Sequence, residues 1–523
     1  MRRLPAVLLF IVSGIALAAP PKGFDGRVQA LMRQMEVPGA TVAIVENGAV
    51  TLARGYGLRS RGGTERVGPD TLFQIGSTTK AFTTAALGIL VDEGKLRWDD
   101  RVIDHLPGFQ MYDPWVTREI TVRDLLVHRS GLGLGHGDLL FIPSTNLSRD
   151  ETVRRVRFLK PATSFRSAYA YDNILYIVAG AVIEAVSGQR WEDFVRDRIF
   201  VPLGMDRSVT NDPDRLAVAD RAFPHGRVGE IRGIGTQVAF DEKMVALGEN
   251  SAPAGAIASG ANDLAKWLLV QLAGGKLPGS EARLFTEASA REMWQPVVPL
   301  PITPLPGALA DATPSFRSYA LGWVAQDYRG HRVITHNGAT LGFRAIVMLL
   351  PEKNVGFALA MNSEDGPFLA GLPFELLDHY LGLPKRDWPK AFAGFIAERN
   401  AKGLEAVRAA AASRPESKPS LPLPAYAGKY TDVWYGQIEI AEDSGGLSID
   451  FLQTPGMRAK LEHWAYDTFV ARWQDPLTEP AYVTFSLDAG GKPERITMKA
   501  VSPVADFSYD YHHLEFRPVP PAP

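Results

Sequence analysis

Ser77-Thr78-Thr79-Lys80 opens a predicted helix that runs to Val91 and is capped by Gly94. Positions three apart share one face of a helix, so the Ser77 hydroxyl and the Lys80 amine are expected side by side. A serine hydroxyl needs a base within hydrogen-bond reach before it can act as a nucleophile, and a neutral lysine amine can be that base. Burial lowers the pKa of a lysine, and the residues around Lys80 are apolar. Alone, the same pattern is also typical of a helix-capping serine and a surface lysine.

A second short pattern, Tyr171-Asp172-Asn173, precedes a predicted helix over residues 173–186. A loop at this point can direct the Tyr171 and Asn173 side chains into one cleft. Tyrosine can donate and accept a proton, and asparagine can donate and accept hydrogen bonds. The structural alternative is a core tyrosine followed by a helix-capping asparagine.

A third pattern, His336-Asn337-Gly338, ends a predicted strand over residues 331–336. Gly338 lets the backbone come close to a ligand. The next backbone amide, that of Ala339, can then join the Ser77 amide in binding an oxyanion, and loss of one such donor costs about 3–4 kcal/mol. The alternative for His336 is a strand-end histidine without function. Because all three patterns occur in plausible contexts, we predict that they meet in one site, with Ser77, Lys80 and Tyr171 catalytic.

Other catalytic chemistries have little support in the sequence. It contains no G-x-S-x-G, no H-E-x-x-H, no phosphate-binding loop and no dinucleotide-binding fingerprint. It contains no cysteine, which excludes disulfides, thiolate metal sites and a cysteine nucleophile. We therefore predict no cofactor and no metal. His128 could complete a Ser-His-Asp triad, but we interpret it as structural because a lysine base leaves no role for it.

The composition is that of a soluble globular protein with a large core. Of the 523 residues, 46% are hydrophobic and 22% are charged, and the length favours two or more domains. The formal net charge is −2 and no basic run is present, so no nucleic-acid partner is predicted.

The first residues are typical of a secretory signal. Arg2 and Arg3 precede an apolar stretch over residues 4–17, and Ala16-Leu17-Ala18 fits a cleavage site. The alternative, a membrane anchor, needs about 20 apolar residues. We therefore predict a cleaved signal peptide over residues 1–18, no stable membrane span after cleavage, and a periplasmic or secreted protein.

Strand-like segments lie on both sides of a long helical region. A hairpin is predicted over residues 41–56 around Asn47-Gly48, and further strands are predicted over residues 331–336, 343–350 and 355–361. This pattern predicts one antiparallel sheet completed by distant segments, with a helical lobe inserted between them. Residues 296–314 contain six prolines and are predicted as a long surface loop.

A second domain is predicted near the C-terminus. An alanine-rich helix over residues 388–412 is followed by four closely spaced prolines, so residues 384–420 are predicted as a helix and a stiff linker. Beyond it, short segments of alternating polarity, separated by glycine turns, indicate a small antiparallel barrel over residues 421–517.

In the order of its three patterns the chain resembles the serine β-lactamase and penicillin-binding-protein-like family, and more narrowly the class C β-lactamase-related esterases and D-peptidases. The resemblance covers residues 23–383 and includes the segments 125–132, 253–259 and 320–323. It implies an α+β fold in which an antiparallel sheet of about five strands, flanked by helices, lies beside an all-helical lobe, with the site between them. Residues 421–517 resemble the lipocalin-like barrel appended to some of these peptidases. Such a barrel can cover the cleft or form contacts in a homo-oligomer, and the sequence leaves both roles open.

The resemblance also implies an acyl-serine mechanism. Ser77 would attack a carbonyl, and Lys80 and Tyr171 would share the proton transfers in an order that the sequence does not assign. Asn173 would position Lys80 and the substrate, and the amides of Ser77 and Ala339 would hold the oxyanion. Water would then release the acyl group.

One position departs from the β-lactamase pattern. β-Lactamases usually have lysine where this chain has His336, and a largely neutral histidine attracts a substrate carboxylate less strongly. The predicted function is therefore that of a secreted or periplasmic serine hydrolase acting on an ester, an amide or a D-amino-acid peptide, with a small molecule or short peptide as substrate. Three alternatives stay open: a β-lactamase, a penicillin-binding-type binding or sensing protein without turnover, and a carrier whose barrel binds an apolar ligand.

Overall fold

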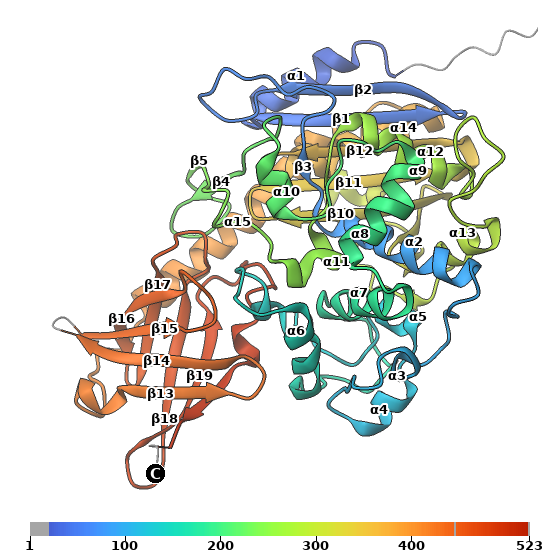
Figure 1. Cartoon of the computed structure of the whole chain (residues 1–523). Coiled ribbons are helices and arrows are strands. Elements are labelled where there is room, and N and C mark those ends of the chain that lie inside the picture. Colours follow the sequence, from blue (N-terminus) through green and yellow to red (C-terminus); the bar gives the residue numbers. More distant parts are fainter. Residues whose placement is uncertain (1–19, 444–445, 521–523) are drawn as a thin grey trace, which may run out of the picture.

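The computed structural model describes residues 20–443 and 446–520. Its two largest sheets each have eight strands; one is open and one is closed into a barrel. Figure 1 shows the open sheet and its helices above and to the right of the barrel. The predicted signal peptide over residues 1–18 lies outside the described residues. Within the described ranges, no helix is long and apolar enough to cross a membrane.

The open sheet joins segments from the two ends of the larger domain. Its strand order is β2-β1-β12-β11-β10-β9-β8-β7, and neighbouring strands are antiparallel. Ala43 in the N-terminal hairpin lies opposite Ala358, which confirms the predicted antiparallel sheet built from distant segments. The strands are β1 (Gly39–Glu46), β2 (Ala49–Gly57), β7 (Val298–Pro299), β8 (Arg317–Tyr319), β9 (Val324–Tyr328), β10 (His331–Thr340), β11 (Phe343–Leu350) and β12 (Val355–Met361).

Three expectations about this sheet need correction. It has eight strands rather than about five, because β9, β8 and β7 continue it beyond β10. The strand β7 comes from the proline-rich segment 296–314, which the sequence predicts as a loop throughout; Val298 pairs with Tyr319 there. Proline has no N–H to donate, which favours a strand of only two residues at the sheet edge. The strand β10 also continues to Thr340 instead of ending at His336.

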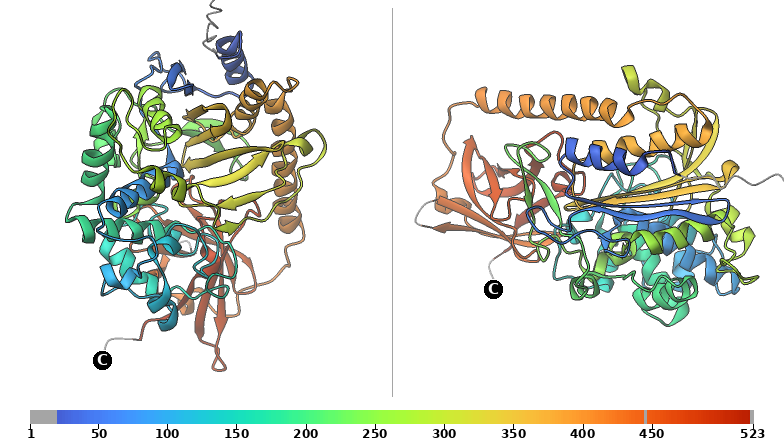
Figure 2. Two further views of the ribbon diagram at one scale, coloured as in Figure 1. Left: turned by 90° about the vertical axis from the view of Figure 1, so that its right-hand side faces the viewer. Right: turned by 90° about the horizontal axis from the view of Figure 1, so that it is seen from above.

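Helices cover both faces of the open sheet, so β1 is buried along its whole length. Val42 and Ile44 share a buried cluster with α1 (Phe24–Gln34) and α14 (Pro367–Leu381). Ala43 and Val45 share a different cluster with α2 (Thr79–Asp92) and α12 (Ala261–Leu272). Alternate residues of a strand point to opposite faces, and the right-hand view of Figure 2 shows these layers edge-on.

The helical lobe is built around α7 (Ile174–Ser187), whose residues 174–183 are all buried. A helix that is apolar on every side is typical of one surrounded by other elements, and α7 packs against α2, α6 and α11. The remaining helices of the described larger domain are α3 (Val102–His105), α4 (Pro114–Glu119), α5 (Val122–Leu125), α6 (Arg149–Arg155), α8 (Trp191–Val195), α9 (Val201–Leu203), α10 (Asp212–Ala217), α11 (Ala252–Gly255) and α13 (Glu287–Met293). Two short antiparallel pairs, β3 (Phe73–Gln74) with β6 (Ala258–Ser259) and β4 (His225–Val228) with β5 (Thr236–Ala239), complete the domain.

The long helix α15 (Trp388–Ala412) leads to the closed barrel. Aromatic side chains pack inside it: the ring of Phe451 lies 5.0 Å from that of Tyr435 and 5.3 Å from that of Trp473, measured between centroids. Closure pairs both edges of the sheet, because β20 pairs with β13. The barrel strands are β13 (Gly428–Asp432), β14 (Gly436–Asp443), β15 (Gly446–Phe451), β16 (Arg458–Ala465), β17 (Thr468–Trp473), β18 (Ala481–Leu487), β19 (Pro493–Ala500) and β20 (Glu515–Pro518).

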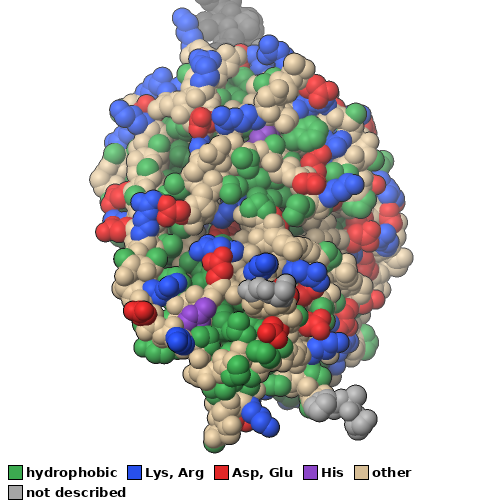
Figure 3. All heavy atoms as spheres, turned by 90° about the vertical axis from the view of Figure 1, so that its left-hand side faces the viewer, with side chains coloured by type: hydrophobic (Ala, Val, Ile, Leu, Met, Phe, Trp, Pro, Cys, Tyr) green, Lys and Arg blue, Asp and Glu red, His purple; other side chains and the backbone are tan. Residues whose placement is uncertain are grey.

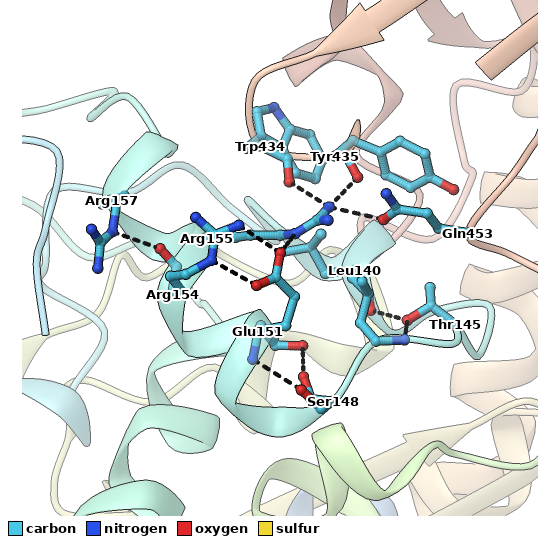
Figure 4. A network of polar contacts seen from close by, with 12 residues as sticks. Leu140, Thr145, Ser148, Glu151, Arg154, Arg155, Arg157, Trp434, Tyr435 and Gln453 are labelled. Carbon is cyan, nitrogen blue, oxygen red and sulfur yellow. Dashed lines mark hydrogen bonds and ion pairs between the residues drawn. The ribbon is translucent and has the colours of Figure 1, made fainter. Parts of the chain in front are cut away.

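The barrel docks on the helical lobe through polar contacts. Arg155 of α6 donates to the carbonyl oxygens of Trp434 (3.1 Å) and Tyr435 and to Gln453 Oε1 (2.8 Å), as Figure 4 shows. The segment between β19 and β20, residues 501–514, is called the barrel connection below, and it also packs against the larger domain. Figure 3 shows acidic and basic side chains interspersed over one face of the molecule, in keeping with a net charge of −2.

Candidate active site

Ser77 lies in a tight turn immediately before α2. Residues Gly76–Thr78 form a 3-10 turn and α2 begins at Thr79, two residues later than the sequence predicts. Gly76 has a φ of +51°, and a methyl group on it would lie 2.5 Å from the amide nitrogen of Ala339. Both its conformation and this close approach require glycine. The turn leaves the Ser77 side chain partly exposed.

Lys80 is fully buried, and its amine contacts three oxygen atoms. The Nζ atom donates to Ser77 Oγ (3.0 Å), Asn173 Oδ1 (2.7 Å) and the carbonyl oxygen of Ala254 (2.9 Å). Burial lowers the pKa of Lys80 to about 7, although the carboxylates of Asp138 and Asp172 oppose this shift. A substantial fraction of the amine is therefore neutral near pH 7, beside the Ser77 hydroxyl.

Asn173 connects Lys80 to a buried carboxyl group. Its Oδ1 atom accepts from Lys80, and its Nδ2 atom donates to Asp138 Oδ2 at 2.8 Å. Asn173 stands at the N-cap position of α7, but its side chain forms no capping hydrogen bond. The capping role that the sequence suggests is thus absent, because both ends of the amide are already engaged by other side chains.

The Tyr171 ring lies beside Lys80, with its centroid 5.0 Å from Nζ. Burial raises the pKa of Tyr171 well above its usual value, and a hydrogen bond with Ser77 works in the opposite direction. The phenol therefore carries its proton at neutral pH, next to the hydroxyl of Ser77. His128 packs against the other side of this loop, with its ring centroid 4.2 Å from that of Tyr171, and its Nδ1 atom accepts from the amide of Asp172.

His336 is a buried, neutral member of the same group. Its Nδ1 atom lies 2.7 Å from the carbonyl oxygen of Asn337, which can only accept, so Nδ1 carries the proton. Its Nε2 atom then accepts from the Tyr319 hydroxyl at 2.7 Å. Burial, aided by the charge of Lys80, lowers the pKa of His336 to about 3. Its ring centroid lies 6.4 Å from that of Tyr171.

Gly338 brings β10 against the turn that carries Ser77. A methyl group on Gly338 would lie 1.8 Å from the carbonyl oxygen of Ile75 and 3.3 Å from the Ser77 amide nitrogen. Any larger residue would push the strand away from the turn. The backbones of Ser77 and Ala339 therefore lie side by side, as an oxyanion-binding pair requires.

The structure thus brings Ser77, Lys80, Tyr171 and Asn173 into one site, with His336 and the Gly338–Ala339 backbone along its edge. Sequence reasoning missed Asp138, Tyr319 and Ser508, which contact these residues directly or through one another. Asp138 follows a glycine-rich run, which signals a loop but names no partner. Tyr319 directly precedes the segment 320–323 that carries the family resemblance. Ser508 lies in the barrel connection and has no local signal.

Comparisons with known proteins match both parts of the chain. The family description "Beta-lactamase" matches residues 24–380, and "Domain of unknown function (DUF3471)" matches residues 412–518. Penicillin-binding protein 4 of Amycolatopsis lactamdurans is 31% identical over 375 residues, which are 70% of this chain and 91% of that protein. The Unguisins hydrolase ungD of Aspergillus violaceofuscus is 28% identical over 485 residues, which are 86% of this chain and 82% of that protein.

A solved structure shares the whole architecture. The octameric penicillin-binding protein homologue from Pyrococcus abyssi superposes with a TM-score of 0.59 at 20% identity, over 95% of this chain and 99% of that one. At this identity the likeness concerns the fold. The sequence matches decide the family: with the family description covering more than half of its length, this chain belongs to the Beta-lactamase family, together with penicillin-binding proteins.

Proposed function

We propose that this protein is a secreted serine hydrolase that forms an acyl-enzyme at Ser77, with Lys80 as the general base. The contacts of the Lys80 amine carry the proposal. Two of its three partners, Asn173 Oδ1 and the Ala254 carbonyl oxygen, can only accept hydrogen bonds. The neutral amine keeps donating to these two oxygens, so its lone pair faces Ser77 Oγ, 3.0 Å away.

Tyr171 is the proposed proton donor to the leaving group. Its raised pKa keeps the phenol protonated, which suits an acid better than a base. As Ser77 Oγ bonds to the substrate carbonyl carbon, its proton moves to Lys80. The leaving amine or alkoxide then takes the phenol proton, and the Lys80 ammonium returns a proton to the phenolate. Water attacks the acyl-enzyme by the reverse proton route, which releases the acid and restores Ser77.

In both tetrahedral intermediates, the backbone amides of Ser77 and Ala339 are the proposed donors to the oxyanion. Because His336 is buried and neutral, it offers no cation for a substrate carboxylate. This supports an ester, an amide or a D-amino-acid peptide as the substrate class. The relative named as an Unguisins hydrolase supports hydrolysis as the type of reaction. We also propose export after cleavage of residues 1–18, and a domain at 23–383 joined to a barrel at 421–517 through residues 384–420.

The test compares the wild type with Ser77→Ala in two assays, covalent labelling by a fluorophosphonate and hydrolysis of short p-nitrophenyl esters. Loss of the nucleophile is expected to abolish labelling and to lower kcat by at least about a thousandfold. Ser448→Ala is a matched control, because this serine lies on a barrel strand, away from the site, and its hydroxyl donates to the Ala441 carbonyl oxygen.

Equal ester hydrolysis by Ser77→Ala and the wild type would contradict the proposal. Intact-mass measurement distinguishes the binding-protein alternative, which predicts a stable adduct at Ser77 without turnover. Nitrocefin in the same series tests for β-lactamase activity, and D-amino-acid amides test for a D-peptidase.

A further inference from the structure

The barrel connection sends two polar side chains into the larger domain beside the catalytic group. Ser508 Oγ donates to Asp138 Oδ2 at 2.8 Å. The Asp510 carboxylate accepts from the backbone amides of Gly137 (2.8 Å) and Leu139 (3.2 Å). Asp138 and Asp510 are fully buried and Ser508 is nearly so. Two segments that are far apart in the sequence therefore share one buried polar cluster.

A continuous chain of hydrogen bonds leads from this cluster to the nucleophile. Ser508 and Asn173 both donate to the same oxygen, Asp138 Oδ2, each at 2.8 Å. The second oxygen of Asp138, Oδ1, has no hydrogen-bond partner among the described residues. Asn173 in turn accepts from Lys80, which donates to Ser77. The barrel thus lies four hydrogen bonds from the Ser77 hydroxyl.

This chain fixes the direction of the Asn173 amide. The Lys80 ammonium only donates, so the Asn173 oxygen faces Lys80, and the NH₂ group of Asn173 faces Asp138 Oδ2, which accepts from it. A flipped amide would place two oxygens together and would turn the NH₂ group toward the Lys80 amine. The orientation that leaves the Lys80 lone pair for Ser77 therefore depends on Asp138, and the Asp138 oxygen is held in place by Ser508.

Several contacts besides that of Ser508 join the barrel to the larger domain. Arg155 binds three acceptors on the barrel, Asp510 binds two backbone amides, and His513 stacks on His136. These contacts join the two domains without a hydrogen bond to the side chains of Asp138, Asn173 or Lys80. The Ser508 hydroxyl differs from them because it bonds to the same atom that orients Asn173.

The groups around Asp138 determine how readily its carboxyl group takes up a proton, and Ser508 is one of them. Burial, together with the neighbouring Asp510, raises the pKa of Asp138 well above its usual value, although the hydrogen bonds from Ser508 and Asn173 and the charge of Lys80 act in the opposite direction. Asp510 is itself buried, with a pKa of about 8. Asp172 acts on Lys80, and the charge of Asp138 acts on Tyr171. Asp432 acts on Asp510, and His513 Nδ1 lies 3.4 Å from Asp510. Ser508 therefore favours the carboxylate form of Asp138.

We propose that Ser508 and Asp138 are positioning residues of the hydrolase, and that the barrel completes the active site by holding the Asn173 amide, and through it Lys80, in the reactive arrangement. This inference rests on the proposed function at Ser77. It assigns to the barrel a part in the chemical step and predicts that a serine outside the larger domain controls how the base titrates.

The experiment measures the rate of Ser77 labelling by a fluorophosphonate from pH 5 to pH 9, and kcat and KM for a short p-nitrophenyl ester. The proteins are the full-length wild type, Ser508→Ala, Ser508→Thr and the control Ser448→Ala. Ser508→Ala is expected to lower kcat about tenfold, as for a buried acceptor that loses a hydrogen-bond donor, with KM nearly unchanged. Ser508→Thr keeps a hydroxyl and is expected to restore most of the loss. The control is expected to match the wild type.

The pH profile separates positioning from simple loss of structure. In the wild type the rate should rise with pH through about 7 as Lys80 loses its proton. Without the Ser508 donor, Asp138 takes up a proton more readily, and a neutral Asp138 no longer supports the Lys80 ammonium. The labelling rate of Ser508→Ala is therefore expected to rise at a lower pH than that of the wild type. Asp138→Asn removes the charge at constant size and should move the rising limb of the profile in the same direction.

Wild-type kcat and an unmoved rising limb in Ser508→Ala would overturn the inference. A different result would also overturn it: a loss of activity in Ser508→Ala that follows a lower melting temperature and that Ser508→Thr does not rescue, with the rising limb of the pH profile unmoved in both Ser508→Ala and Asp138→Asn. Absence of Ser77 labelling in the wild type would instead reject the proposed function, and the inference with it. A loss confined to variants at positions 508 and 138, with normal labelling of the wild type and of Ser448→Ala, would support it.

Discussion

The two eight-stranded sheets of this protein reach the active site in different ways. The open sheet contributes a strand: the backbone of β10 lies against the turn that carries Ser77, where Gly338 permits direct contact. The closed barrel pairs both of its edges and fills its interior with aromatic rings. In the described part of the chain, it reaches the site through a connection between strands, residues 501–514. The open sheet thus places the backbone of one strand in the active site, whereas the closed barrel contributes side chains from a loop.

The largest effect is expected where the open sheet touches the nucleophile. In Gly338→Ala the added methyl group would lie 1.8 Å from the Ile75 carbonyl oxygen, so β10 must move away from the Ser77 turn. Misplacing one oxyanion donor is expected to lower kcat by about a hundredfold or more. The measurement is ester hydrolysis together with the melting temperature. Gly26→Ala is the matched control, because its methyl group would meet nothing within 4 Å.

Normal kcat in Gly338→Ala would contradict the role given to the open sheet, which is to place the β10 backbone in the active site. It would mean that the position of the β10 backbone does not matter for the chemical step, and that the oxyanion is bound elsewhere.

A smaller, pH-dependent effect is expected at the docked face of the barrel. The imidazole rings of His136 and His513 stack at 3.8 Å, and His512 lies against His513. Burial lowers the pKa of His136 to about 3 and that of His513 to about 4. Their contribution to docking is thus fully present above pH 6.5 and is lost as the pH falls toward these values. The raised pKa of Asp510, about 8, has the opposite effect, since its neutral form is favoured when docked.

Replacing His136 by phenylalanine separates these opposing contributions. His136→Phe keeps an aromatic ring against His513 but removes one group that resists protonation. Relative to the wild type, the variant should become progressively more stable as the pH falls below 6.5, with little difference at pH 7.5. Hydrogen exchange of the amides in residues 501–514 at pH 5 and pH 7.5 measures this difference. Faster exchange in the variant than in the wild type at pH 5 would contradict the expected sign.

The smallest effect is expected from a barrel side chain at the site. The ring of Phe507 lies edge-on to Tyr171, with 5.8 Å between centroids, and is 38% exposed. It is therefore available to an apolar group of a bound substrate. In Phe507→Ala we expect KM for aromatic acyl esters to rise about threefold, the size of one aromatic contact, with kcat nearly unchanged. Val433→Ala removes another exposed apolar side chain of the barrel and is the control.

A change in kcat without a change in KM in Phe507→Ala would show that this ring supports the catalytic group itself. Phe507 would then be a second barrel residue, besides Ser508, that affects the chemical step.

The sequence predicts those parts of the site that depend on local spacing. Ser77 and Lys80 meet because they are three residues apart at a helix start, and Tyr171 and Asn173 share one short loop. The same holds for the fold: the hairpin around Asn47-Gly48 and the alternation of the barrel strands are local patterns.

The remaining features depend on tertiary contacts that leave no local pattern. Tyr319 bonds to His336 only because β8, β9 and β10 extend the sheet side by side. The strand β7 exists because the edge of that sheet accepts a two-residue addition, even from a proline-rich segment. Ser508 reaches Asp138 only after the barrel has docked, so its role cannot be predicted from either domain alone.

The pairing of β1 with β12 has a consequence for how the protein is made. Ala43 pairs with Ala53 on one side but with the distant Ala358 on the other, so most of the larger domain must leave the ribosome before the middle of the sheet can form. Pairing between such distant segments is slow, because the loop must close before any contact stabilises it. During synthesis the N-terminal hairpin therefore keeps one edge without a strand partner until residues 355–361 have been made.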